Sequence, residues 1–480
     1  MSAPLDKLLR DARVDLVLSR IEKDPSIIND VINYLDSDIR SIRFNSIFVL
    51  GELSQKSEAA ISKLIGCLQD TDWSIRREAA RTLGKIGNIA NNAVSPLTKL
   101  LMDEEVSIRK EVATSLGRIC YASDECISTL TNTLKDQDEE VRTEAAKALG
   151  ELGSESYSAM ANLMKSMKDV SWTVRTASAH SISLIGREST KAIPTLINAL
   201  EDQDWRVRYR VIDTLAIIGE EVIPNVLEIL NHRNPTVRKG AIEVIGELRI
   251  SKPEIINNLA NMLFDKVESV RGKAVDALRS IGREAVPTII DAMRKSNSTM
   301  KRLLISALGG IGTDAKEAIP TLNNILKIKD EDKQKIVKRL YSHSLSDRIA
   351  SLFFNLFKDP LSIKAFIRGE VARALGKIGE GSEEALNALQ ESLIDPKAIV
   401  RREAALSIGK LGSFSSVAAS ALVKALNDRE PDVRWRASEA LGLIKVNNPD
   451  IISGLEGLVH DVCDYVCESA INALDNITEE

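Results

Sequence analysis

The hydrophobic positions of this chain form pairs of short helical stripes separated by an acidic turn. In residues 57–87, SEAAISKLIGCLQDTDWSIRREAARTLGKIG, the apolar residues of 60–68 follow i, i+1, i+4, i+5 and i+8 spacing. This spacing predicts one buried face of a short helix. Asp70 and Asp72 interrupt the stripe, and Asp72 is well placed to cap a following helix.

The second stripe predicts a longer helix. The residues expected to point inward are Ala79, Ala80, Leu83 and Ile86. Those expected to point outward are Arg77, Glu78, Arg81 and Lys85. Gly87 is predicted to end the helix, because a glycine is the usual residue just beyond a helix C-terminus.

This two-helix unit recurs along the chain, with an arginine near the start of each second helix. The arginines spaced by 33 residues are Arg43, Arg76, Arg109, Arg142, Arg175 and Arg208. The series continues as Arg238, Arg271 and Lys301, and then as Arg368, Arg401, Arg434 and Cys467. A period of this size is typical of stacked helix pairs. We therefore predict an all-α fold, a right-handed α-solenoid (superhelix) of about 14 two-helix repeats.

Three further positions recur relative to the arginine, which is numbered zero. An aspartate lies at −6, and glycines lie at +8 and +11. A glycine inside a helix costs about 1 kcal/mol relative to alanine. Its recurrence at +8 therefore indicates that another helix backbone packs close to this position.

The recurring aspartate and arginine predict a structural ladder. Since neighbouring helices pack at roughly 8–10 Å, each arginine can reach the aspartate of its own repeat or of the adjacent one. The predicted ladder residues are Asp70, Arg76, Asp103, Arg109, Asp136, Arg142, Asp169, Arg175, Asp202 and Arg208. We interpret them as structural, because an active site is not normally built many times over.

Two segments carry a family resemblance. AIPTLINALEDQDWRVRYRVIDTLAIIG (192–219) and AIVRREAALSIGKLG (398–412) resemble HEAT repeats, and are closest to the short phycobilisome-lyase-like subclass. The resemblance implies the fold but not a particular partner. Related HEAT-like hydroxylases bind iron through His-Glu pairs; none of His180, His232, His343 and His460 is followed by Glu, so we reject that activity.

The repeat pattern predicts one solenoid over residues 1–480. Its expected parts are an N-terminal cap (1–34), regular repeats (35–326), a degenerate or extended repeat (327–367), regular repeats (368–460) and a C-terminal cap (461–480). Because both ends are atypical repeats, we expect a monomeric solenoid.

The degenerate repeat is the first place where we look for function. Five aromatic residues fall within 26 residues, Tyr341, Phe353, Phe354, Phe357 and Phe366, beside a mixed charge cluster that includes Lys338 and Arg339. One interpretation is a partner-binding element with aromatic anchors, to which Lys338, Arg339 and Tyr341 belong. The other is that the phenylalanines fill a core widened by a mismatched repeat.

The outward positions +1, +2, +5 and +9 of the second helices are the other candidate surface, because they are expected to line the concave side. They suggest a groove that is basic toward both ends and more acidic in the middle. The candidate residues are Arg77, Arg81, Lys85, Lys110, Arg118, Lys147, His180, Tyr209, Asp213, Glu243, Asp276, Arg373, Lys377, Arg402, Trp435 and Arg436. The alternative is an ordinary solvated surface, since glutamates such as Glu78, Glu111 and Glu403 lie between the basic residues.

Composition disfavours some classes of function but does not identify a specific one. The formal charge of −5 and pI near 5.7 give no global preference for nucleic acid or anionic membranes. No apolar run reaches the roughly 18 residues that span a bilayer, and the N-terminus lacks a signal-peptide core. The five cysteines include no CxxC pair, which favours a cytoplasmic location. We predict no catalytic residues, no cofactor and no metal site.

The leading hypothesis is therefore a non-enzymatic protein-binding scaffold or adaptor that uses the concave surface of the solenoid. A nucleic-acid-binding protein is one alternative, which the interleaved glutamates disfavour. An enzyme subunit resembling the bilin lyases is the other, although no chromophore-handling residue can be assigned.

Overall fold

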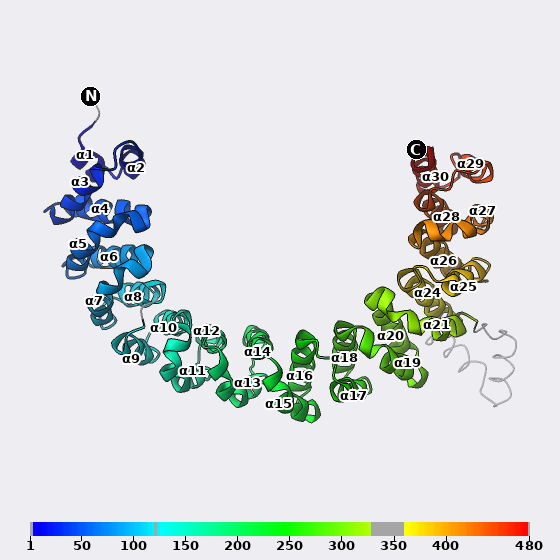
Figure 1. Cartoon of the computed structure of the whole chain (residues 1–480), viewed down its shortest axis with the longest axis horizontal. Coiled ribbons are helices and arrows are strands. Elements are labelled where there is room, and N and C mark those ends of the chain that lie inside the picture. Colours follow the sequence, from blue (N-terminus) through cyan, green and yellow to red (C-terminus); the bar gives the residue numbers. More distant parts are fainter. Residues whose placement is uncertain (1–2, 120–121, 328–359, 479–480) are drawn as a thin grey trace, which may run out of the picture. The chain divides into compact units, whose positions relative to one another are not determined.

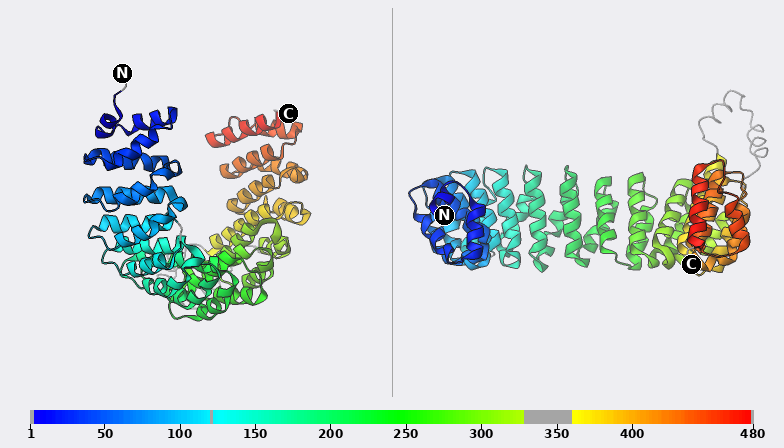
Figure 2. Two further views of the ribbon diagram at one scale, coloured as in Figure 1. Left: turned by 60° about the vertical axis from the view of Figure 1, so that its left-hand side comes forward. Right: turned by 90° about the horizontal axis from the view of Figure 1, so that it is seen from above.

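The computed structural model describes residues 3–119, 122–327 and 360–478, which contain helices and no strand. The predicted all-α class is confirmed. The chain forms two compact units, Met1–Val244 (unit 1) and Ile245–Glu480 (unit 2). Figures 1 and 2 show that each unit is a stack of helix pairs.

Unit 1 begins with α1 (Leu5–Arg10) and α2 (Val14–Lys23), followed by the repeats. The first helices of its repeats are α3 (Ile27–Asn33), α5 (Ile61–Cys67), α7 (Val94–Leu100), α9 (Asp124–Thr133), α11 (Met160–Ser166), α13 (Ile193–Ala199) and α15 (Ile223–Glu228). The second helices are α4 (Arg40–Leu53), α6 (Trp73–Ile86), α8 (Val106–Ile119), α10 (Glu139–Glu151), α12 (Trp172–Leu184) and α14 (Trp205–Ile218). The unit boundary falls within α16 (Pro235–Leu248).

Unit 2 repeats the same arrangement. Its first helices are α17 (Pro253–Met262), α19 (Val286–Lys295), α21 (Ile319–Leu326), α25 (Glu383–Ser392), α27 (Ala419–Ala425) and α29 (Pro449–Glu456). Its second helices are α18 (Glu268–Ile281), α20 (Ser298–Ile311), α24 (Pro360–Ile378), α26 (Ala398–Lys410), α28 (Pro431–Ile444) and α30 (Asp464–Thr478).

Short 3₁₀ helices occur at the turns. They are η1 (Tyr34–Asp36), η2 (Ser54–Ala60), η3 (Gly87–Ala93), η4 (Gly153–Ala159), η5 (Arg187–Ala192), η6 (Glu220–Val222), η7 (Ile229–Asn231), η8 (Arg283–Ala285), η9 (Gly312–Ala318) and η10 (Gly412–Ala418).

The helix boundaries follow local chemistry. The side chain of Asp72 accepts a hydrogen bond from the Ser74 amide at the start of α6, which confirms the predicted cap. At the other end Gly87 has a φ of 76°, a conformation that glycine adopts without strain. The +11 glycines all take positive φ except Gly379, where Gly381 does so instead.

The +8 glycines let successive second helices approach closely, which confirms the packing prediction. A Cβ built on Gly150 would lie 2.9 Å from the Cα of Ser181, the small +6 residue of the next second helix. The same contact between Gly409 and Ala440 would be 2.6 Å. Because real Cβ atoms do not approach so closely, only glycine permits this packing at these two positions. Within each unit, the second helices therefore form a tightly packed layer, which we call the second-helix layer.

The apolar stripes meet between the two layers of each unit. Leu83 and Ile86 of α6 are fully buried, as is Leu64 of α5. One outward assignment was wrong: Glu78 is only 1% exposed. Arg81 pairs with Glu78 and also with Glu111 of the next repeat, a contact that a pattern confined to one helix does not reveal.

Candidate partner-binding surfaces

The Arg–Asp ladder joins each repeat to the next one. Arg142 Nε and Nη2 donate to the two carboxylate oxygens of Asp169 at 2.8 and 2.9 Å. Its Nη1 donates to the backbone oxygens of Asp136 and Gln137, at 2.8 and 3.0 Å, in its own repeat. One guanidinium thus links the turn of its own repeat to the turn of the next repeat, whose aspartate lies 27 residues after the arginine.

The same bidentate geometry recurs in both units. The pairs are Arg43–Asp70, Arg76–Asp103, Arg109–Asp136, Arg142–Asp169, Arg175–Asp202, Arg368–Asp395, Arg401–Asp428 and Arg434–Asp461. Burial alone would raise the pKa of Asp169, but hydrogen bonds from Arg142 and the Ser171 amide outweigh it and lower that pKa. Both partners of each pair are largely buried, so the ladder offers little surface to a ligand.

The ladder changes at Arg208. The next repeat is three residues shorter, and His232 takes the position that aspartate occupies elsewhere. Arg208 Nη1 donates to the backbone oxygens of Asp202 and Gln203 at 2.7 and 3.0 Å. Among the described residues no carboxylate pairs with its side chain.

The faces of α6, α8 and α10 are covered by ion pairs. Arg81 of α6 donates to Glu111 of α8 at 2.8 Å and also contacts Glu78 at 3.2 Å. Burial raises the pKa of Glu78, and Arg81 opposes that rise. The predicted basic residues Lys85, Lys110 and Lys147 pair with Glu52, Glu140 and Glu144, respectively. The predicted basic end of the groove therefore carries mixed, largely compensated charge.

The remaining predicted residues of this surface are distributed as follows. The Arg77 guanidinium lies 5.1 Å from the centre of the Trp73 ring, and Arg118 is exposed. Asp213 pairs with Arg210 at 2.8 Å, and Asp276 pairs with Arg279 at 3.3 Å. Glu243 is partly exposed, and Lys377 is exposed.

Exposed aromatic and aliphatic side chains lie on α12 and α14, and α14 also carries the Arg210–Asp213 ion pair. Trp172 and Leu184 are 36% and 45% exposed on α12, and Trp205, Tyr209 and Ile217 are 65%, 65% and 55% exposed on α14. Trp205 and Tyr209 are four residues apart on α14, so these two side chains lie on the same side of the helix. We call these five residues the α12–α14 aromatic face. Tyr209 was among the concave-surface candidates, and the sequence allowed two interpretations of Trp172 and Trp205, which precede the second helices at −3: packing residues or a ridge that contacts a partner.

Polar groups hold part of this face in place. The Arg206 guanidinium stacks 3.5 Å from the centre of the Trp172 ring and pairs with Asp204 at 2.6 Å. His180 is also on α12, and its pKa is lowered by burial and then by the charge of Arg210. The imidazole is thus held toward its neutral form.

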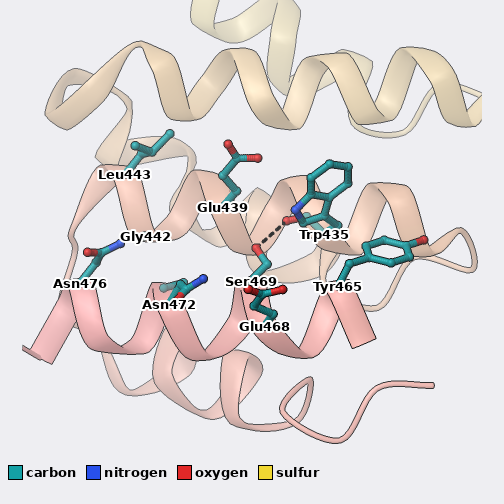
Figure 3. Close-up of a pocket in the computed structure, with 10 residues that line it drawn as sticks. Trp435, Glu439, Gly442, Leu443, Tyr465, Glu468, Ser469, Asn472 and Asn476 are labelled. Carbon is teal, nitrogen blue, oxygen red and sulfur yellow. Dashed lines mark hydrogen bonds between the residues drawn. The ribbon is translucent and has the colours of Figure 1, made fainter. Parts of the chain in front are cut away.

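A second open surface lies in unit 2, in a groove of about 340 Å³ between α28 and α30. Figure 3 shows its walls, with Trp435, Glu439 and Leu443 on α28 and Tyr465, Glu468, Asn472 and Asn476 on α30. We call it the α28–α30 groove. The Trp435 and Tyr465 rings meet edge to face, with centres 5.6 Å apart. Ser469 Oγ donates to the backbone oxygen of Trp435 at 3.3 Å.

The sequence candidates account for only part of this groove. Trp435 lines it, and Arg436 stacks 3.7 Å from the centre of the Trp435 ring and pairs with Glu439. The residues of α30 were missed because that helix was treated as a cap. Continuing the +1, +5 and +9 positions into the last repeat would have identified Glu468, Asn472 and Asn476.

Arg373 of α24 and Arg402 of α26 both pair with Glu403 of α26. Arg373 donates to Glu403 at 3.1 Å, and Arg402 contacts the same carboxylate at 2.8 Å. Burial alone would raise the pKa of Glu403, but these two guanidinium groups outweigh it and lower that pKa.

The candidates of the degenerate repeat lie mostly outside the described residues. Lys338, Arg339 and Tyr341 belong to this set, as do Phe353, Phe354 and Phe357. Phe366 of α24 is described: its side chain is 45% exposed and lies 5.9 Å from the Arg302 guanidinium. Whether this segment binds a partner stays a prediction.

No helix of the described ranges is long and apolar enough to cross a membrane.

Comparison with known proteins identifies the repeat. A family profile described as HEAT repeats matches residues 28–117, 94–183, 160–229, 223–299 and 395–475. A second profile, described as PBS lyase HEAT-like repeat, matches residues 367–395. Both agree with the resemblance expected from the repeat motifs. No curated protein matches the chain at a significant level.

Solved structures show a weaker likeness. An importin-beta structure is 13% identical with a TM-score of 0.47, covering 96% of this chain and 76% of that one. Yeast importin-beta is 13% identical with a TM-score of 0.42, covering 95% and 68%. An engineered protein is 20% identical with a TM-score of 0.29, covering 94% and 98%.

Proposed function

The chain belongs to the HEAT-repeat family, and from this premise we propose that it is a non-enzymatic protein-binding scaffold or adaptor. The partner protein binds the second-helix layer of the repeats. Binding at this layer requires side chains that the fold leaves exposed and that gain free energy when covered.

The α12–α14 aromatic face is the observation that carries this proposal. Trp205 and Tyr209 are each 65% exposed, although tryptophan and tyrosine contribute most when they are buried in an interface. An exposed group of large apolar side chains marks an interaction surface more often than it stabilises a fold. Arg206 stacks on Trp172, so that part of the face is already ordered before a partner arrives.

The charges of the second-helix layer favour a protein over a nucleic acid. Arg81, Lys85 and Lys110 each pair with a glutamate, so they have little uncompensated charge for phosphate groups. A gel-shift titration with duplex and single-stranded probes at low salt tests this alternative. A salt-dependent shift would support nucleic-acid binding instead.

The proposal is tested by affinity capture from native lysate with quantitative mass spectrometry. The wild-type chain is compared with the double variant Trp205→Ala/Tyr209→Ala. We expect a stoichiometric protein partner whose recovery falls at least about tenfold in the double variant, because truncation of interface aromatics costs 2 kcal/mol or more, on the order of thirtyfold.

Trp73→Ala is the matched control. Trp73 occupies the equivalent position at the start of α6 and is 44% exposed, but one turn further on α6 has Arg77, whose guanidinium lies 5.1 Å from the centre of the Trp73 ring, where α14 has the exposed Tyr209. Its recovery should match the wild type. Two results would contradict the proposal: no partner at stoichiometric level, or equal recovery by the wild type and the double variant.

A further inference from the structure

The α28–α30 groove lacks a side-chain bridge that spans the equivalent gap in two other pairs of repeats. Between α6 and α8, Arg81 at +5 reaches Glu111 at +2 of the next repeat. Between α24 and α26, Arg373 reaches Glu403 in the same way. The corresponding residues in the last pair of repeats are Glu439 and Ser469, which cannot form this bridge.

Gly442 and Ala473 line the groove and add little side-chain volume to it. A Cβ built on Gly442 would lie 2.9 Å from the Cα of Ala473, so α28 and α30 pack closely there. Leu443 stands beside this contact and is 50% exposed. The result is a cavity of about 340 Å³ bounded by aromatic, acidic and amide side chains, large enough for one long side chain.

The chemistry of the groove suits a guanidinium group. Trp435 and Tyr465 supply aromatic rings, and Glu439 and Glu468 supply carboxylates from the two helices. Arg436 already stacks on Trp435 and pairs with Glu439, so the charge of Glu439 is compensated and Glu468 is the carboxylate that remains for a ligand. Glu468 forms no ion pair with any residue that the structure describes, so its charge is available to a ligand.

Asn472 and Asn476 add contacts for a peptide backbone. They are exposed and lie one helical turn apart on α30, a separation of about 6 Å. Two residues of an extended chain cover roughly 6.6–7 Å, so the two amides match alternate peptide groups.

We propose that the α28–α30 groove binds an arginine side chain within an extended segment of a partner protein. The inference rests on the proposed scaffold function and specifies a second contact, separate from the α12–α14 aromatic face. Arginine is favoured over lysine because its planar guanidinium can stack its face on an aromatic ring. The N–H groups at the edge of the same guanidinium can then pair with a carboxylate.

The test uses the full chain and fluorescein-labelled peptides of sequence Gly-Ser-Xaa-Ser-Gly, with Xaa as arginine, lysine or citrulline. Citrulline keeps the shape of arginine but has no charge. Fluorescence anisotropy at low salt should show saturable binding of the arginine peptide. The citrulline peptide should bind at least about tenfold more weakly, since charge-assisted hydrogen bonds are roughly twice as strong as neutral ones.

Two variants examine the groove itself. Glu468→Gln should weaken the arginine peptide about fivefold or more, because it removes the unpaired carboxylate. Glu439→Arg/Ser469→Glu rebuilds the bridge found between α6 and α8 and should abolish binding. Glu456→Gln, an equal charge change on an exposed residue of α29, is the matched control and should bind as the wild type does.

Equal affinity for the arginine and citrulline peptides would overturn the inference, and so would unchanged binding by Glu468→Gln. Far-ultraviolet circular dichroism of each variant separates loss of the groove from loss of the fold. If the peptide fails while capture still depends on Trp205 and Tyr209, this inference falls and the scaffold function stands. If the arginine peptide binds but no partner protein is captured, the proposed scaffold function falls and the arginine site stands.

Discussion

The α6–α8 and α12–α14 surfaces of unit 1 share one skeleton but differ in the side chains at their outward positions. Both carry a complete ladder pair, Arg76–Asp103 and Arg175–Asp202. On α6 and α8 the outward side chains are joined by Arg81, whereas on α14 Trp205 stands 65% exposed. The ladder therefore does not determine the surface, and the outward positions vary without disturbing the stack.

This difference separates the residues that stabilise the stack of repeats from the residues that are available to a partner. The inward residues, the ladder and the close glycine contacts stabilise the repeats wherever they occur. The outward positions either add ion pairs to that stability or leave aromatic side chains for a partner. A perturbation of the skeleton should thus affect stability, and a perturbation of an open face should affect binding.

The largest expected effect is acid unfolding, because the ladder pairs respond together. The pKa values of Asp136, Asp169 and Asp428 are lowered by their arginines, despite the opposing effect of burial. A lowered folded-state pKa stabilises the fold above the ordinary value of 3.8, and this contribution disappears as the pH falls through the folded-state value. Urea unfolding measured by circular dichroism at several pH values should show a steep loss below about pH 4. A flat profile there would argue against a stabilising ladder.

Removal of one ladder arginine tests the skeleton directly. Arg175→Ala deletes a bidentate pair and leaves Asp202 largely buried without its partner, so the free energy of unfolding should fall by about 2–3 kcal/mol. Arg208→Ala is the control, because it removes only bonds to backbone oxygens, and it should cost about 1 kcal/mol. Urea titration compares the two, and equal losses would show that the aspartate pairing adds nothing.

The close helix contacts are tested with a pair of glycine variants. In Gly409→Ala the new Cβ would lie 2.6 Å from the Cα of Ala440, and we expect a loss of about 1–3 kcal/mol. In Gly246→Ala the corresponding distance to Ala277 is 3.4 Å, so the variant should be neutral or gain up to about 1 kcal/mol from helix propensity. Thermal and urea unfolding distinguish these outcomes. Equal effects would mean that the contact distance is not what selects glycine.

Single substitutions on α6 and on the α12–α14 aromatic face test the difference between an ion-paired surface and an open one. Arg81→Ala leaves Glu78 buried without its ion pair and should lower the free energy of unfolding by about 1–2 kcal/mol. Tyr209→Ala removes a side chain that is 65% exposed and should change it by less than about 0.5 kcal/mol. Recovery of the partner protein should fall more in Tyr209→Ala than in Arg81→Ala. A large stability loss in Tyr209→Ala would identify the aromatic face as part of the fold rather than an interaction surface.

The smallest effect concerns the end of α28. Lys445 occupies the +11 position with φ of 56° and ψ of 37°, where most repeats have glycine. Lys445→Gly should therefore raise the free energy of unfolding by about 0.5–1 kcal/mol. Lys410→Gly, within α26 of the same unit, should instead cost about that amount. A loss on both substitutions would show that the left-handed conformation at 445 carries no strain.

The sequence alone determined the helix pairs, their acidic turns and the positions where glycine is needed. Asp72 and Gly87 act on backbone groups within a few residues, so their roles follow from local spacing. The spacing also located the Arg–Asp ladder, but it left open which aspartate each arginine binds. That choice depends on where the next repeat places its turn, 27 residues further on.

Only the tertiary structure decided which outward residues are buried, paired or available. Glu78 is expected at the surface of an isolated helix, yet it is buried and paired with Arg81, which also reaches Glu111 of the next repeat. Trp205 and Glu468 also lie at outward positions of second helices but stay exposed, and within the described part of the chain Glu468 forms no ion pair. Local spacing determines the direction of a side chain relative to its own helix. Contacts between repeats determine what that side chain meets, and these contacts separate the stabilising faces from the open ones.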